Sequence, residues 1–150
     1  MTELAKKRPE FRNINAFKDL TTYRMTPAAW VSILHRASGA IMFLLLPFVI
    51  WMFDKTVTSE YSYAKFMMVF TTNPRYVQGP TLVLGIFLKL VALALLWAFL
   101  HHFISGLRHV WMDVSHDAVD KRTGALSAKV VLVLSLSLTA VLGAKLFGLY

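Results

Sequence analysis

The sequence predicts an all-α integral membrane protein with three transmembrane helices. Hydrophobic residues make up 57% of its 150 residues and charged residues only 16%. Its mean hydropathy is +0.56, whereas soluble domains usually fall below zero. Three long apolar segments, each able to cross a bilayer core that needs about 20 helical residues, leave little sequence for a soluble domain.

The first apolar segment, residues 27–53, is expected to form a bent helix. Thr26 and Pro27 are typical of an N-cap and a first helical residue. Pro47 lacks an amide hydrogen and would remove the bond to the carbonyl of Phe43. We therefore expect a kink in the middle of this span.

Segments 80–112 and 126–149 form the other two predicted spans. A Gly-Pro pair opens the second span, which is longer than one bilayer thickness and should tilt or project. Gly124 precedes the third. The connection between the first and second spans, residues 54–79, is rich in aromatic side chains and suits an interfacial loop or a short surface helix.

The distribution of basic residues predicts the orientation. Residues 1–26 carry six Lys and Arg and no apolar stretch, so we expect a cytoplasmic basic segment rather than a signal peptide. Only three basic residues lie between the first two spans, which places the N-terminus in the cytoplasm and residues 27–150 in a membrane anchor. Topology and lipid attraction thus explain the net charge of +8, and nucleic acid is not an expected partner.

Ionisable side chains interrupt the first two spans, where they are costly. On the first helix, Ser32 lies three and four residues before His35 and Arg36, so it shares a face with both. In one interpretation these residues form a polar site. In the other, Arg36 snorkels to the membrane boundary and His35 is merely interfacial, and the spacing leaves both open.

The second span carries two polar stripes on neighbouring faces: His102, Gly106 and His109 on one, and His101, Ser105 and Arg108 on the other. Gly106 leaves room beside an imidazole for a large flat ligand. Haem is often held by a neutral imidazole, and its propionates could pair with Arg36 or Arg108. Zinc is a weaker alternative, because it needs three or four converging ligands and the chain has no Cys.

Counting residues predicts the depth of these groups. At 1.5 Å per residue, His102 lies roughly 16 Å from the cytoplasmic end of its helix. The remaining polar residues should gather between it and the cytoplasm: Ser32, His35, Arg36, Arg108 and His109. No other span then offers a well-placed histidine at the depth of His102. We therefore expect a partner chain to donate the second axial ligand of a six-coordinate haem iron.

Two motifs occur in order, after Arg8-Pro9 in the basic segment. They are Ser32-Ile33-Leu34-His35-Arg36-Ala37-Ser38-Gly39 and His102-x3-Gly106-Leu107-Arg108-His109-x3-Asp113. Together they resemble the cytochrome b556 membrane-anchor subunits of bacterial succinate dehydrogenase, and the likeness extends from Arg8 to the third span. The resemblance implies that this chain forms half of a haem-binding helical bundle.

The same resemblance implies the partners of the chain. One haem b would be shared with a second three-helix membrane-anchor subunit that donates the other axial His. An iron–sulfur subunit and a flavoprotein subunit would dock on the cytoplasmic face of the bacterial inner membrane. Such a complex, respiratory complex II, passes electrons from succinate in the tricarboxylic acid cycle to ubiquinone, and the anchor by itself is not catalytic. A haem-free scaffold anchor of a fumarate reductase-type complex remains the alternative.

The resemblance also implies residue roles. These are His102 as the axial ligand to the haem iron, His35, Arg36 and His109 near the haem propionates, Ser32 and Arg36 in the ubiquinone pocket, and Asp113 as a candidate for proton supply. The adjacent His101 leaves a one-residue ambiguity in the axial ligand.

Overall fold

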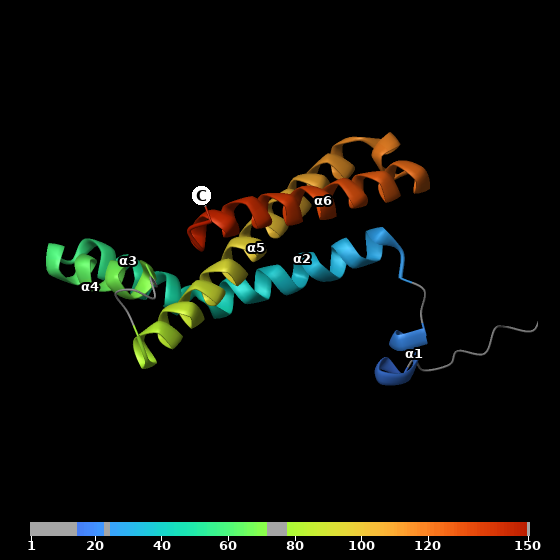
Figure 1. Cartoon of the computed structure of the whole chain (residues 1–150). Coiled ribbons are helices and arrows are strands. Elements are labelled where there is room, and N and C mark those ends of the chain that lie inside the picture. Colours follow the sequence, from blue (N-terminus) through green and yellow to red (C-terminus); the bar gives the residue numbers. More distant parts are fainter. Residues whose placement is uncertain (1–14, 23–24, 72–77, 150) are drawn as a thin grey trace, which may run out of the picture.

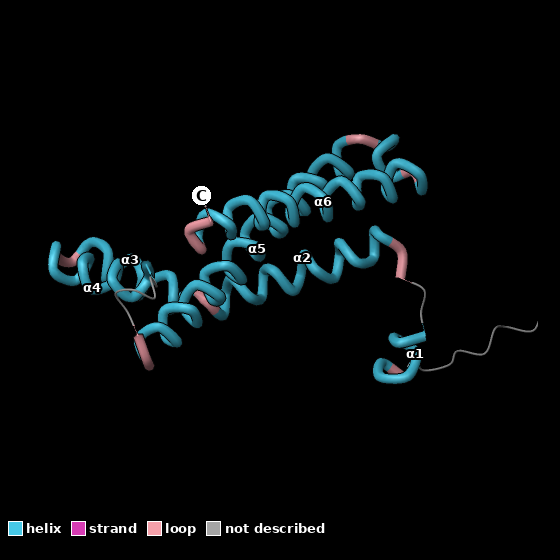
Figure 2. Tube along the Cα trace, in the orientation of Figure 1, coloured by secondary structure: helices cyan, strands magenta, loops and turns pink. Residues whose placement is uncertain are grey.

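The computed structural model describes residues 15–22, 25–71 and 78–149. Within these ranges the chain is helical and has no strand (Figures 1 and 2). The elements are α1 (Ala16–Thr22), α2 (Pro27–Leu44), α3 (Leu46–Val57), α4 (Glu60–Thr71), α5 (Pro80–Val114), the short 3-10 helix η1 (His116–Val119) and α6 (Lys121–Leu146). Helices α5 and α6 are long and apolar enough to cross a membrane, and α2 with α3 forms a third, bent candidate. The predicted all-α membrane fold is confirmed.

The first span is broken in two, as the proline in it predicts. Thr26 caps α2, its Oγ1 accepting a hydrogen bond from the amide of Ala29 at 3.3 Å. Helices α2 and α3 then meet at an angle of 48°. The break falls at Leu45, two residues before Pro47, which occupies the first turn of α3 where its missing amide hydrogen costs nothing.

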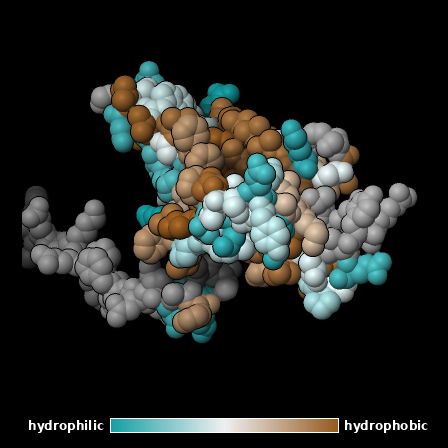
Figure 3. Space-filling view, turned by 90° about the vertical axis from the view of Figure 1, so that its left-hand side faces the viewer, coloured by the Kyte–Doolittle hydropathy of each residue, from teal (hydrophilic) through white to brown (hydrophobic). Residues whose placement is uncertain are grey.

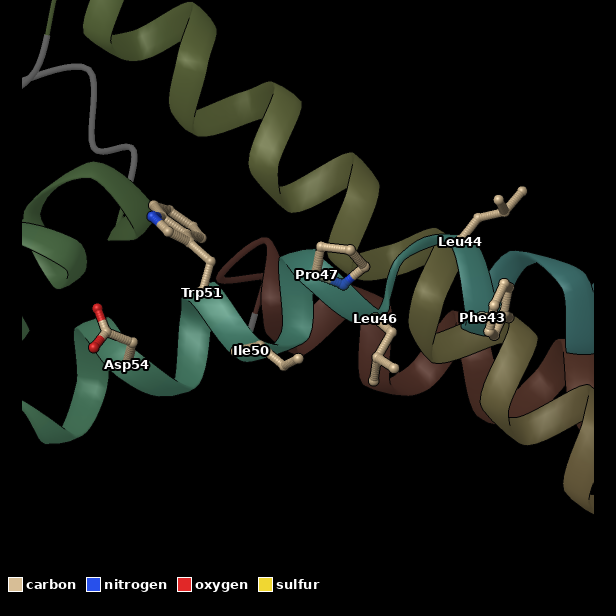
Figure 4. A pocket seen from close by; sticks show the side chains of 7 residues that line it. All are labelled: Phe43, Leu44, Leu46, Pro47, Ile50, Trp51 and Asp54. Atoms are coloured by element: carbon tan, nitrogen blue, oxygen red, sulfur yellow. The ribbon is translucent and has the colours of Figure 1, made fainter.

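The bend opens a broad surface hollow of about 710 Å³. Figure 4 shows its lining side chains, which are Phe43, Leu44, Leu46, Pro47, Ile50, Trp51 and Asp54. All but the carboxylate are apolar, and Phe43 is 75% exposed. Contiguous exposed apolar surface of this kind suits lipid chains or another apolar helix.

The connection between the first and second spans contains a short helix, α4, as predicted. It lies beside α3 (Figure 1), and the ring of Phe66 packs edge-on against Trp51 with centroids 6.0 Å apart. Phe66 also stacks on Phe70 at 5.0 Å. The α3–α4 pair is therefore held together by aromatic side chains.

The helix that contains the third predicted span begins before that span. Helix α6 starts at Lys121 instead of residue 126, because the carboxylate of Asp120 caps it by accepting a hydrogen bond from the amide of Arg122 at 3.0 Å. Gly124, expected to precede the helix, lies in its first turn and is buried against its neighbours. The second span, in contrast, differs from its predicted end by only two residues.

Helices α2, α5 and α6 pack against one another. Their shared core is small and consists of Val31, Ala128 and Val131. Large apolar side chains point outward instead, among them Phe87 and Val133, which are 59% and 66% exposed. Figure 3 shows broad hydrophobic areas on the surface beside hydrophilic ones. Small residues at the helix contacts and apolar residues outside are typical of helices packed within a bilayer.

Candidate functional site

Three histidine rings stack between α2 and α5. His35 of α2 lies against His102 and His109 of α5, with ring centroids 4.1 Å and 5.0 Å apart. These three residues are called the histidine cluster below. The prediction that His102 and His109 share a face is confirmed, because both rings meet the same residue of α2.

His35 lies level with His102, whereas the sequence placed it nearer the cytoplasm. The depths estimated from residue counts assumed that the first residue of α2 and the last residue of α5 lie at the same level in the membrane. His35 is eight residues from Pro27, whereas His102 is twelve from Val114. Because the two rings stack, α5 must extend about 6 Å beyond the start of α2 at 1.5 Å per residue.

The ring of His102 is held by the helix opposite. Its Nδ1 lies 3.0 Å from the carbonyl oxygen of His35 and 3.4 Å from Oγ of Ser38. A carbonyl oxygen can only accept, so Nδ1 carries the proton and donates it. The lone pair of Nε2 is then free, and Nε2 has no hydrogen-bond partner in the described part of the chain. This is the tautomer that a histidine needs to bind a metal through Nε2.

Gly39 provides the space that the His102 ring occupies. A Cβ atom at Gly39 would lie only 3.0 Å from Cε1 and 3.3 Å from Nδ1 of that ring. On the other side of the cluster, Nε2 of His35 is buried with no hydrogen-bond partner among the described residues, near Gly106. An unpaired buried nitrogen costs about 1–3 kcal/mol, so this atom is suited to a polar group brought by another molecule.

His101 faces away from the cluster, toward α6, and also contacts the backbone of Val31 on α2. It is 1% exposed, and its Nδ1 lies 3.1 Å from Oγ of Ser135. Its Nε2 lies 3.3 Å from Oγ of Ser105, and its ring stacks on Trp97. Both ring nitrogens are thus engaged. Of the two adjacent histidines, only His102 presents a free nitrogen.

Arg108 also turns toward α6 and does not join the cluster. Its Nε donates to Oγ of Ser127 at 2.9 Å and its Nη2 donates to the carbonyl of Gly124 at 3.1 Å. The sequence left Arg36 and Arg108 as equal candidates for binding carboxylates. Arg36 is exposed and makes no hydrogen bond or ion pair with any other described residue, so its guanidinium is the one available to a ligand.

The other predicted site residues lie toward the same end of the bundle. Ser32 is half-buried on α2, one turn before Arg36. Asp113 is exposed and is the second-to-last residue of α5. Arg8 and Pro9, the first element of the resemblance, lie outside the described residues.

Sequence reasoning gave no role to Ser38 and Gly39, although both contact His102. A small pair one turn after His35 on the same helix was the available signal. Ser135, on the third span, likewise had no assigned role, yet it binds His101. In each case the sequence did not show which residues of neighbouring helices face each other.

The arrangement does not suit a bare metal ion. Among the described residues, no group of three or more His, Asp or Glu side chains converges on one point. Instead, the rings of His35 and His102 stack face to face. The free Nε2 of His102, without two further protein ligands converging on it, fits a metal that brings most of its other ligands with it, as haem iron does. The residues present therefore fit a haem bound at His102.

Comparisons with known proteins identify the family of the chain. Residues 6–142 match the model of the succinate dehydrogenase/fumarate reductase transmembrane subunit family. The chain is also 30% identical over 118 residues to the succinate dehydrogenase cytochrome b556 subunit of Coxiella burnetii (strain RSA 493 / Nine Mile phase I). That alignment covers 78% of this chain and 83% of the relative. All members of the histidine cluster lie within the family match.

Proposed function

Since the chain belongs to the succinate dehydrogenase/fumarate reductase transmembrane-subunit family, we propose that it anchors a succinate dehydrogenase and holds haem b jointly with a second anchor subunit. The observation that carries the haem assignment is His102, whose Nδ1 is tied to a carbonyl at 3.0 Å while Nε2 is free. The name of the Coxiella relative, a cytochrome b556 subunit, denotes a b-type haem in that protein.

In this proposal His102 would hold the haem iron, together with a histidine of the partner anchor. The bound haem supplies a one-electron carrier. The carbonyl of His35 orients the His102 ring, and Gly39 accommodates it. The unpaired Nε2 of His35, with His109 and the cation of Arg36, would face the carboxylates of the haem.

Ser32 and Arg36 would line a ubiquinone pocket near the same end of the bundle. Two electrons from the iron–sulfur subunit and two protons reduce the quinone to a quinol. The guanidinium of Arg36 stabilises negative charge that develops on a quinone oxygen, and the hydroxyl of Ser32 can position the carbonyl. Asp113, exposed at this end, is proposed to supply protons.

The proposed organisation puts the electron-donating subunits on the cytoplasmic face of a bacterial inner membrane. Residues 1–26 would form a cytoplasmic basic segment and residues 27–150 the anchor. The iron–sulfur and flavoprotein subunits would then dock beside Ser32 and Arg36, which lie near the first turns of α2. The chain itself performs no chemistry on succinate.

A spectrum of the intact assembly tests this function. We expect the complex purified through a tag on this chain to contain a flavoprotein, an iron–sulfur protein and a second small hydrophobic subunit. Its reduced-minus-oxidised spectrum should show the bands of a six-coordinate b-type haem. A colourless complex with the same subunits would favour the haem-free scaffold instead.

Substituting Gly39 tests the space around His102. We expect Gly39→Val to lower the haem-to-protein ratio strongly, because even a Cβ would lie 3.0 Å from the ring. Gly39→Ala should have a smaller effect. Ala40→Val, an enlargement at the neighbouring exposed position, is the matched control. Full haem content in Gly39→Val would contradict the assignment.

Substituting Ser38 tests the hydrogen bond that orients the ligand. Oγ of Ser38 donates to the carbonyl of His35 at 2.8 Å, so it shares that acceptor with Nδ1 of His102. In Ser38→Ala the carbonyl is left to His102, which strengthens electron donation by the imidazole. We expect redox titration to show a more negative haem potential, by up to the ~59 mV of a tenfold one-electron change. Ser137→Ala is the control, and an unchanged or raised potential would argue against this role.

A further inference from the structure

A cavity of about 320 Å³ lies between α3, α4 and α5, away from the histidine cluster. Its lining combines two kinds of side chain. Lys55 and Lys65 contribute cations, beside Tyr61. Val69 of α4 and Leu84 and Leu88 of α5 contribute an apolar wall. The cavity is thus amphipathic, with both of its charged groups positive.

The two lysines retain hydrogen-bonding capacity. Nζ of Lys55 lies 3.0 Å from a carboxylate oxygen of Asp54, in an exposed pair that leaves other donors of the ammonium free. Nζ of Lys65 lies 4.6 Å above the ring of Tyr61, a contact that uses no hydrogen-bond donor. Asp54 lines the adjoining hollow at the bend, which shares Trp51 with this cavity, but it does not line the cavity itself.

The cavity lies at the level where a membrane boundary is expected. It adjoins the first turns of α5, the 35-residue helix that exceeds one bilayer thickness. Trp51 and Tyr61 line it, and these residue types concentrate at the interface between lipid and water. The apolar wall continues along α5 to Leu88, which is 8% exposed. A ligand here would have its charged group in the interface and its apolar part against α5.

We propose that this cavity binds one glycerophospholipid, with Lys55 and Lys65 binding the phosphate and an acyl chain lying along Val69, Leu84 and Leu88. The paired cations match the anionic phosphodiester, and the apolar wall matches a hydrocarbon chain. A volume of about 320 Å³ holds the head group region and part of one chain, while the rest of the lipid stays in the bilayer. The site requires the membrane location of the chain but not its haem.

Native mass spectrometry of the detergent-purified, delipidated complex tests the proposal, with phosphatidylglycerol as the added probe. We expect one lipid to bind the wild-type complex tightly, and to bind the Lys55→Gln/Lys65→Gln variant roughly 30-fold more weakly. The control is Lys129→Gln/Lys145→Gln, which removes two exposed lysines of α6 outside the cavity. The subunit composition seen in the same mass spectra reports whether the variants fold and assemble.

Two further probes separate the chemistry of the head group from that of the chain. Diacylglycerol with the same acyl chains lacks the phosphate, and inorganic phosphate lacks the chains. Neither should displace phosphatidylglycerol from the wild-type complex. The proposal is overturned if the double lysine variant of the cavity binds the lipid like the wild type, if diacylglycerol competes equally, or if inorganic phosphate alone displaces the lipid.

Discussion

Replacing His102 with alanine is expected to remove the b-type haem bands from the purified complex, whereas His101→Ala retains most of them. The two residues are adjacent, but their ring nitrogens have different partners. His102 donates from Nδ1 to the carbonyl of His35 and keeps Nε2 free. His101 binds Ser135 and Ser105 with its two nitrogens. Only His102 can bind iron without breaking an existing hydrogen bond.

The effect of His101→Ala should appear in stability instead. Removing this imidazole leaves Ser105 and Ser135 without their shared partner at the buried α5–α6 contact. Hydrogen bonds between membrane helices contribute about 0.6 kcal/mol on average and up to about 1.7 kcal/mol. We therefore expect a lower unfolding temperature for the complex with its spectrum largely unchanged.

Rescue by a small ligand separates coordination from folding. In His102→Gly, added imidazole should restore the haem bands, because the vacated space lies beside Gly39 and beside the carbonyl of His35. Subunit assembly is followed on native gels in parallel. The assignment moves by one residue if His101→Ala loses the haem while His102→Ala keeps it.

Much of the fold could be predicted from single-helix patterns. The apolar segments gave the spans, and Pro47 gave the break between α2 and α3. Helical spacing correctly separated the face of His102 from that of His101, since this depends only on 3.6 residues per turn. The apolar pattern did not predict that α6 starts at Lys121. This start depends on a hydrogen bond from the amide of Arg122 to the carboxylate of Asp120, and both residues lie outside the apolar segment.

Relations between helices could not be predicted in the same way. The level of His35 relative to His102 depends on how far α5 extends beyond α2. The pattern of residues along a single helix does not predict this distance. The direction of Arg108 depends on Ser127 and Gly124, which lie on the following helix. The motifs indicated the candidate residues, and the resemblance implied Arg36 near the propionates. The packed structure adds that Arg108 binds Ser127 and Gly124 of α6.

Arg36→Leu is expected to lower electron transfer from succinate to ubiquinone by on the order of 10²-fold, the loss typical of removing one donor that stabilises a developing anion. Oxidation of succinate with a soluble dye should change little, because the dye takes electrons before the quinone pocket. The guanidinium of Arg36 is exposed and unbonded to the rest of the described chain, so its removal breaks no internal contact there.

Two substitutions show whether the effect belongs to the position and to its geometry. Arg122→Leu removes an exposed arginine from the first turn of α6, and both activities should stay near those of the wild type. Arg36→Lys keeps the charge but loses the planar fork of donors, so quinone reduction should fall between wild type and Arg36→Leu. An equal loss of both activities in Arg36→Leu, with the complex still assembled, would show that the residue supports the docked subunits rather than the quinone. A selective loss in Arg122→Leu instead would place the quinone pocket beside α6.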